Sequence, residues 1–313
     1  MYFLRRKSLR IIKVLFLFFV KISPPLQMDK LNWNQDKAVI LAAYYTATNA
    51  SNLELIRIAK ENYQKLEKVY PLIEYVLERT NAVAMLIEQD LLWDADIIIR
   101  SALETLSKFM FIADSEEETR EALLNEYWKD LSEIYSIKLH EQAKKNLKYT
   151  SSSETHRLSY SALLFSEEDE LRLKSKWTKS ERSKLEQKWS FTGIINHLSK
   201  KNKDNAMEIF EFLTHSYRMS SHITHGDEFG VSLILERKSR SEQERNDIHI
   251  AHYLRLVSDC FDYCLMTAIY TTKYLNVSPK YFLTLFESLS EINLLTKKYH
   301  SVPFNDKIYD KFR

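Results

Sequence analysis

Glycine and proline are scarce in this sequence, which has three glycines and five prolines among 313 residues. Hairpins and other tight sheet connections depend on these residue types, so their scarcity argues against a fold built on β-strands. The glycines stand at positions 193, 226 and 230, and this spacing cannot form a glycine-rich phosphate-binding loop. The sequence therefore predicts an all-α protein, an antiparallel helical bundle with long helices.

Cysteine is also rare. The two cysteines, Cys260 and Cys264, stand one helical turn apart in an apolar segment. Two thiols do not make a disulfide framework, and no further cysteine is present to complete a zinc site. We therefore expect both residues to be buried structural thiols, and we predict neither a bound metal nor another cofactor.

An excess of positive charge is confined to the start of the chain. The formal net charge is +2, and six basic residues precede the first acidic one, Asp29. Without those six, 39 basic and 43 acidic side chains remain. A mildly acidic body argues against strong non-specific binding of nucleic acid, although it leaves room for local basic surfaces.

Residues 1–27 combine a basic start with an apolar run over residues 11–20. The run is about half the roughly 20 residues that span a bilayer, and no small-residue cleavage site follows it. Three interpretations stay open. Translation begins at Met28, so that the segment is not native and the protein is cytoplasmic; or the segment is signal-like and contacts a membrane surface; or it is an ordinary helix.

Residues 28–300 predict a single helical-bundle domain, and residues 301–313 a tail. Within the bundle, residues 91–112 are apolar on nearly every side, which is typical of an interior helix. Charged side chains nevertheless recur in it at four-residue steps: Asp96, Arg100, Glu104 and Lys108. Buried charges must be paired and hydrogen-bonded. This ladder is therefore either a set of structural ion pairs or part of a functional site.

The densest polar chemistry lies in residues 206–225, which we expect to neighbour residues 91–112. At 100° per residue, one face of this helix gathers four side chains: His215, Arg218, His222 and His225. Gly226 follows where a left-handed residue would end the helix. Such a helix could pack by its apolar side and offer a row of imidazoles to a cleft.

After this helix, the sequence predicts an irregular segment followed by two more helices. Residues 227–235 are expected to be extended or irregular. Ser241 and Glu244 then have the spacing of a capping box, and they predict the start of a long apolar helix that reaches about Leu275. A last helix is expected over residues 279–298.

Two stretches fit the pattern Arg-x(4–6)-His, one from Arg218 to His225 and one from Arg245 to His252. This pattern resembles that of the HEPN superfamily, whose all-α domains usually dimerise and bring an Arg and a His from each protomer to a shared, metal-independent RNA-cleaving cleft. The resemblance implies an RNA partner and a homo-oligomer. Chemically, an imidazole can take the proton of a 2′-hydroxyl while a guanidinium holds the phosphate.

A closer resemblance is to an uncharacterised bacterial family of all-helical proteins, known only as a domain of unknown function. It rests on two motifs, Arg-Ser-x-x-Glu in the interior helix and Tyr-x-x-x-Ser-x-x-x-His-Gly in the later one, and on Trp189. It covers roughly residues 70–275. The resemblance implies that five side chains converge in one pocket: Arg100, Glu104, Tyr217, Ser221 and His225.

Two hypotheses about function arise from these patterns. In the first, the protein is a HEPN-like ribonuclease or a protein derived from one, acting in bacterial stress or phage defence. Arg218 or Arg100 then holds the phosphate and His225 is the base, with His222 and Glu104 beside them. In the second, it is a non-catalytic sensor or interaction module whose Arg-Glu-His cluster is structural or binds a small anionic ligand. The remaining candidate binding residues are Tyr217, Ser221, Arg245 and His252.

Overall fold

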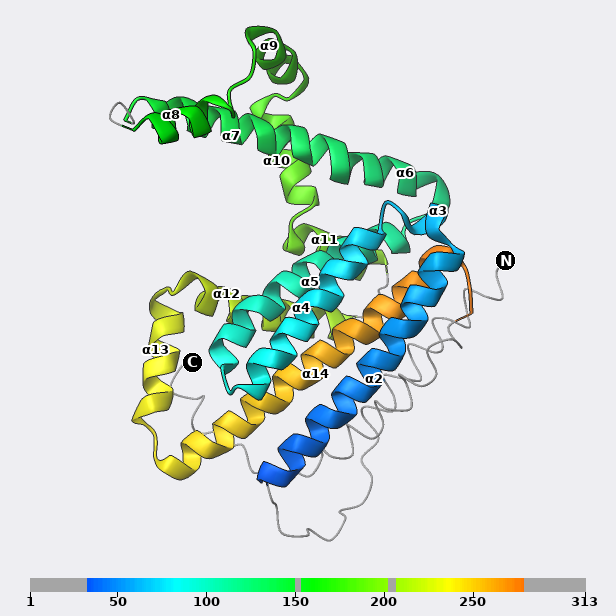
Figure 1. The fold of residues 1–313 in the computed structure, drawn as a ribbon, viewed down its shortest axis with the longest axis vertical. Coiled ribbons are helices and arrows are strands. Elements are labelled where there is room, and N and C mark those ends of the chain that lie inside the picture. The colour runs from blue at the N-terminus through cyan, green and yellow to red at the C-terminus, as the bar shows by residue number, and fades with distance from the viewer. Residues whose placement is uncertain (1–32, 150–152, 202–206, 279–313) are drawn as a thin grey trace. The chain divides into compact units, whose positions relative to one another are not determined.

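The computed structural model describes residues 33–149, 153–201 and 207–278, and for residues 207–212 it describes the backbone alone. Throughout these ranges the chain forms helices and no strand, with several long helices packed together (Figure 1), so the predicted all-α fold is confirmed. None of the described helices is both long and apolar enough to cross a membrane. The predictions for residues 1–27, 279–298 and 301–313 lie outside the described residues.

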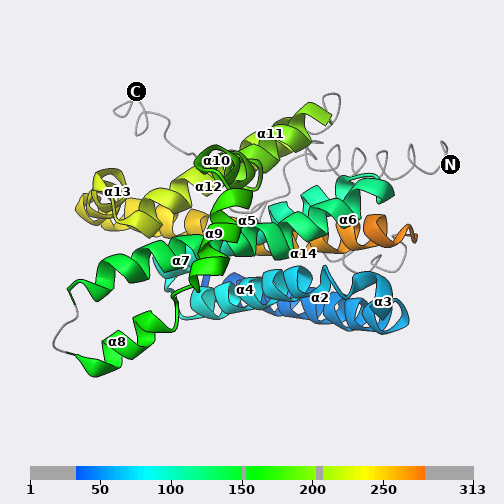
Figure 2. The same cartoon turned by 90° about the horizontal axis from the view of Figure 1, so that it is seen from above.

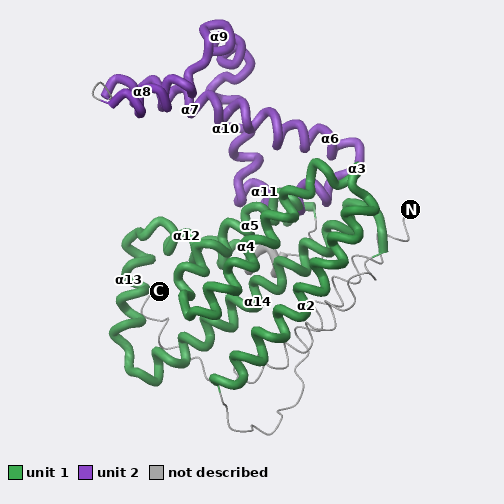
Figure 3. The backbone as a smooth tube through the Cα atoms, viewed as in Figure 1, with its two compact units in different colours: residues 1–109, 199–313 green, residues 110–198 purple. Residues whose placement is uncertain are grey.

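The chain divides into two compact units (Figure 3). The first contains residues 1–109 and 199–313, and the second contains residues 110–198. The described helices of the first unit are α2 (Trp33–Glu61), α3 (Tyr63–Leu66), α4 (Tyr70–Glu88), most of α5 (Leu92–Asp114), α12 (Met207–His225), α13 (Glu228–Ser239) and α14 (Glu242–Leu275). The second holds the end of α5, α6 (Glu117–Asn125), a π-helical turn η1 (Glu126–Asp130), α7 (Leu131–Leu147), α8 (Glu154–Ser161), α9 (Glu167–Lys176), α10 (Lys179–Lys188) and most of α11 (Phe191–Lys201).

The first unit is built on α14, a helix of 34 residues that packs along α2 and α4 (Figures 1 and 2). The predicted capping box begins it, since the side chains and backbones of Ser241 and Glu244 bond reciprocally. It ends at Leu275, and Asn276 follows in the left-handed conformation. Tyr253, Phe261 and other large side chains of α14 are fully buried. The prediction of this helix and both of its ends is confirmed.

The two cysteines lie inside this packing. Both are free thiols in the core, as expected. The Sγ atom of Cys264 is 3.6 Å from the hydroxyl of Thr80 on α4. Burial raises the pKa of the Cys264 thiol to about 11, so it stays protonated at neutral pH and serves as a small apolar group.

The second unit uses aromatic side chains to join its helices. The Nε1 atoms of Trp177 and Trp189 donate to Glu133 at 2.8 Å and to Glu126 at 3.0 Å. The rings of Trp189 and Phe111 meet edge to face, with centroids 5.3 Å apart. Each indole therefore buries an apolar body and satisfies its one donor.

The prediction for residues 227–235 is wrong, because residues 228–235 are helical and belong to α13. Gly226 takes the left-handed conformation with φ +55°, which turns the chain. Asp227 then caps the new helix, its Oδ1 accepting from the backbone N–H of Gly230 at 3.0 Å. The apolar, partly β-branched composition favoured an extended segment, but this cap and the packing of α13 against α12 decide for a helix.

Candidate functional site

A buried carboxylate on α5, Asp96, is the centre of the polar contacts between helices of the first unit. Its residue is 3% exposed. Oδ2 lies 2.6 Å from Nε2 of His252 on α14. Oδ1 accepts from the guanidinium of Arg255 and, at 3.4 Å, from the hydroxyl of Ser220 on α12. One carboxylate thus joins α5, α12 and α14.

The protonation of His252 follows from its two partners. Nη1 of Arg237, on α13, is 2.9 Å from Nδ1 of His252. A guanidinium can only donate, so Nδ1 is the acceptor and the ring proton sits on Nε2, which donates to Asp96. Burial lowers the pKa of His252 despite the neighbouring Asp96, which keeps the imidazole neutral. The imidazole also meets the ring of Trp93 edge to face, with the ring centroids 4.9 Å apart.

The charges around Asp96 are balanced by ion pairs. Burial by itself raises the pKa of Asp96, but the hydrogen bond from His252 and the charge of Arg255 outweigh it and hold the pKa below its usual value. Arg255 also donates to Asp259 at 2.9 Å. Burial raises the pKa of Asp259 to about 6, against the opposing effect of Arg255. This network has the form of a structural ion-pair cluster.

One and two turns after Asp96 on α5, Arg100 and Glu104 meet Tyr217 of α12. The Tyr217 hydroxyl accepts from Nη2 of Arg100 at 3.0 Å and donates to Oε1 of Glu104 at 3.0 Å. The two charged groups are 3.1 Å apart, and their side chains are 15% and 34% exposed. The guanidinium carbon also lies 4.8 Å from the centroid of the tyrosine ring. Residues of the two predicted motifs therefore meet here.

The other two residues of the predicted pocket lie farther along α12. Because Asp96 contacts Ser220 whereas Arg100 contacts Tyr217, α5 and α12 run antiparallel. Residues after Tyr217 therefore run toward the start of α5, away from Arg100. His225 is exposed and stands about 12 Å beyond Tyr217 at 1.5 Å per residue. Among the described contacts, none joins it to Arg100.

An exposed histidine–carboxylate pair stands at the end of α12. Nδ1 of His222 is 2.7 Å from Oδ2 of Asp227, and the imidazole side chain is 41% exposed. The backbone N–H of Gly230 and the His222 ring hold the pKa of Asp227 below its usual value. The carboxylate is therefore ionised near neutral pH and can orient the imidazole. Arg218, also exposed, precedes His222 by one helical turn.

The second Arg-x(4–6)-His stretch is divided between two environments. Arg245 is exposed and its Nη1 donates to the backbone carbonyls of Lys238 and Arg240, at 3.4 and 3.0 Å. His252 is buried against Asp96. The arginine therefore closes the turn between α13 and α14, whereas the histidine belongs to the core.

The sequence model of a family of unknown function, DUF5677, matches residues 69–243, which is more than half of the chain. The chain belongs to this family. Searches of the curated proteins and of the solved structures find no match. The range matched by DUF5677 contains the Arg100–Glu104–Tyr217 contact and the His222–Asp227 pair, and it ends before His252.

Five polar residues of these clusters were missed from the sequence: Ser220, Asp227, Arg237, Arg255 and Asp259. Asp227 could have been found as a helix cap, since it follows a predicted helix-ending glycine. Arg255 and Asp259 have the i,i+4 spacing of an ion pair within an apolar helix, which is a signal of a buried pair. Nothing in the sequence indicates that Arg237 contacts His252.

The described residues offer no cluster of three or more His, Cys, Asp or Glu side chains that could hold a metal ion. The chemistry that they do offer is proton transfer by imidazole and phosphate binding by guanidinium.

Proposed function

We propose that the protein is a metal-independent ribonuclease, or is derived from one, and that its site is the exposed end of α12. This α12-end surface consists of Arg218, His222, His225 and Asp227. The observation that carries the proposal is the 2.7 Å contact between Nδ1 of His222 and Asp227 on an exposed surface. A carboxylate that holds one ring nitrogen leaves the other nitrogen free to act as a base.

Each residue of the α12-end surface has a role in this proposal. Arg218 binds the scissile phosphate through its guanidinium. Nε2 of His222 takes the proton of the 2′-hydroxyl, and the 2′ oxygen attacks phosphorus to form a 2′,3′-cyclic phosphate. The bond from phosphorus to the 5′ oxygen breaks, and His225 as imidazolium gives that oxygen a proton. Atoms and charge balance without a further reagent.

The cluster formed by Arg100, Glu104 and Tyr217 has a supporting role in this proposal. Arg100 is mostly buried and its guanidinium is engaged by Glu104 and Tyr217, so the more accessible Arg218 is the better phosphate ligand. The likeness of Arg218-x(6)-His225 to the HEPN pattern supports RNA as the substrate and a homodimer as the active form. It also supports a place in bacterial stress or phage defence.

A non-catalytic module is the second candidate, and one observation favours it. The charged groups around Asp96 and Arg100 are partly or fully buried and paired with one another, as expected for a structural core. In this case the α12-end surface binds RNA or a small anionic ligand through Arg218 and the imidazoles without cleaving it.

RNA cleavage by the purified full-length chain tests the proposal. The substrate is an end-labelled single-stranded RNA in buffer with EDTA, and its 2′-deoxy counterpart serves as the uncleavable control. We expect His222→Ala and Arg218→Ala each to lower the cleavage rate by at least about 100-fold, since a general base contributes roughly that much.

Two matched variants keep this test specific. His215→Ala removes an exposed histidine of the same helix, and Arg245→Ala removes an exposed arginine from the second Arg-x(4–6)-His stretch. Both should cleave at the wild-type rate. If the wild-type chain binds RNA but does not cleave it, the non-catalytic module replaces the ribonuclease. If all variants cleave alike, the α12-end surface is not the site.

A further inference from the structure

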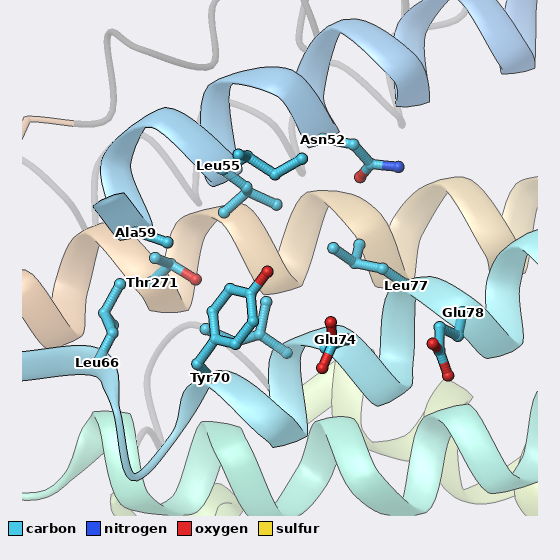
Figure 4. Close-up of a pocket in the computed structure, with 11 residues that line it drawn as sticks. Asn52, Leu55, Ala59, Leu66, Tyr70, Glu74, Leu77, Glu78 and Thr271 are labelled. Atoms are coloured by element: carbon cyan, nitrogen blue, oxygen red, sulfur yellow. The ribbon is translucent and has the colours of Figure 1, made fainter. Parts of the chain in front are cut away.

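A cavity of about 180 Å³ lies between α2, α4 and α14 in the first unit (Figure 4). It opens to solvent beside Ile56, Glu74 and Glu78, which are exposed. Its inner wall is apolar and buried, and is formed mainly by Leu55, Ala59, Leu66 and Ile73. It shares no lining residue with the α12-end surface, so a ligand bound in it is independent of the proposed function.

Five polar side chains line this cavity. Two are carboxylates, Glu74 and Glu78; the others are the side-chain amide of Asn52 and the hydroxyls of Tyr70 and Thr271. Glu74 and Glu78 stand one turn apart on α4. Asn52 on α2 has a buried Oδ1 without a hydrogen-bond partner, and leaving a buried acceptor unpaired costs about 1–3 kcal/mol. Among the described residues, no Lys or Arg lines the cavity.

The lining is divided into two ends. Figure 4 shows Asn52 and Glu78 at one end, and Ala59 and Leu66 at the other, with Glu74 and the ring of Tyr70 between them. Arg79 has its Nη2 3.7 Å from the carboxylate of Glu78, but it does not line the cavity. The cavity thus offers a polar end, with Asn52 and Glu78, and an apolar end to the same ligand, and the carboxylate of Glu74 lies between them.

We propose that this cavity binds a small organic cation, an ammonium group carried on an apolar body. An ammonium has three donors and no acceptor, which complements the Oδ1 of Asn52 and the carboxylates of Glu74 and Glu78. The ring of Tyr70 adds a face for a cation. An apolar cavity of about 150 Å³ accepts a benzene ring, so a body of one ring or a short alkyl chain fits.

Calorimetric titration of the full-length chain tests this with three probes of the same shape and different charge. These are benzylammonium chloride, benzyl alcohol and sodium benzoate. We expect benzylammonium to bind with a Kd at least about tenfold lower than that of benzyl alcohol, which corresponds to one charge-assisted hydrogen bond. Benzoate should give no binding, because carboxylates line the cavity mouth.

Two substitutions assign the binding to this cavity. Glu74→Gln should weaken benzylammonium binding by about fivefold or more, and Asn52→Leu should do the same by removing the unpaired acceptor. Glu67→Gln is the matched control, since it removes an exposed carboxylate of the same unit that does not line the cavity. Thermal unfolding of each variant shows that it is folded.

Several results would overturn the proposal. Equal affinity for benzylammonium and benzyl alcohol would show that the cavity binds the apolar body and does not recognise the charge. Benzylammonium binding that is unchanged in both Glu74→Gln and Asn52→Leu would place the ligand elsewhere. No binding of any probe at millimolar concentration would show that the cavity is not a ligand site. None of these results bears on RNA cleavage.

Discussion

At the scale of single residues, Asp96 shows how a charge is kept in the core of the first unit. Its two oxygens take hydrogen bonds from a neutral imidazole, a guanidinium and a hydroxyl on two other helices. Replacing such a carboxylate removes a negative charge while Arg255 stays in place. The cost is large because the remaining cation is partly buried and loses one of its two partners.

We therefore predict that Asp96→Asn destabilises the protein by about 3 kcal/mol, measured by urea unfolding followed by circular dichroism. Asp94→Asn on the same helix is the control. Asp94 is exposed, so its substitution should change the free energy of unfolding by less than about 0.5 kcal/mol. Equal effects of the two substitutions would mean that the network around Asp96 contributes no stability.

Asp227 has two roles that substitution can separate, because it caps α13 and holds the ring of His222. Asn caps a helix as well as Asp does but carries no charge, whereas Ala can neither cap the helix nor hold the imidazole. If the ribonuclease proposal holds, Asp227→Asn should keep the melting temperature and lower the cleavage rate by about tenfold. Without the carboxylate, nothing fixes the orientation of the His222 ring toward the 2′-hydroxyl, so the rate of the proton-transfer step falls.

Asp227→Ala provides the comparison for that measurement. It should lose about 1 kcal/mol of stability from the missing cap in addition to the loss of activity. An Asp227→Asn variant that cleaves at the wild-type rate would remove Asp227 from the mechanism.

At the scale of helices, the sequence predicts long elements better than short ones. The apolar periodicity of α5 and α14 extends over many turns, and the core positions follow it. For α13, a helix of 12 residues, the composition points to a strand while the cap points to a helix. Short helices are decided by such local hydrogen bonds and by the helix they pack against, and single-residue propensity cannot weigh these contacts.

The sequence predicts which side chains of the site share a face of one helix, but not which residues of a second helix reach them. The four-residue spacing on α5 indicates correctly that Arg100 and Glu104 share a face, and they pair. Which residues of another helix reach them depends on the direction and axial position of that helix. The antiparallel course of α12 brings Tyr217 to Arg100 and carries His225 away from it. A helical wheel contains no information about this axial order.

Gly226, between α12 and α13, and Gly230, in the first turn of α13, allow a matched prediction. A Cβ at position 230 would stand 2.4 Å from the backbone oxygen of His222, whereas a Cβ at position 226 would meet nothing within 4 Å. Gly226→Ala should therefore cost only the left-handed strain, about 1 kcal/mol. Gly230→Ala should cost more, since it forces α13 away from α12.

Hydrogen exchange distinguishes these two outcomes. In Gly230→Ala we expect faster exchange of the α13 amides and a larger fall in melting temperature than in Gly226→Ala. Equal losses in the two variants would mean that the close approach at Gly230 does not hold α13 in place.

At the scale of the whole molecule, carboxyls that are fully or partly buried make stability depend on pH in two opposite senses. The pKa of Asp96 is lowered in the folded state, so its stabilising contribution is present above its unfolded pKa of about 4 and is lost as the pH falls through the lowered value. The pKa of Asp262 on α14 is raised to about 7 by burial and by the nearby Asp259. The raised pKa of Asp262 therefore makes the protein less stable, not more stable, as the pH rises.

Between pH 4 and about 7 the folded state holds a proton on Asp262 that the unfolded chain has released, so stability falls as the pH rises through this window. Asp262→Asn removes the ionisable group. It should leave the melting temperature nearly unchanged at pH 4.5 and raise it by several degrees at pH 8, since about 1 kcal/mol shifts a protein of this size by roughly 2–4 °C. Calorimetric scans of wild type, Asp262→Asn and the exposed control Asp94→Asn at pH 4.5, 6 and 8 measure the difference. A gain for Asp262→Asn that is the same at all three pH values would show that the carboxyl titrates normally in the folded protein, because only a raised pKa makes the benefit grow with pH.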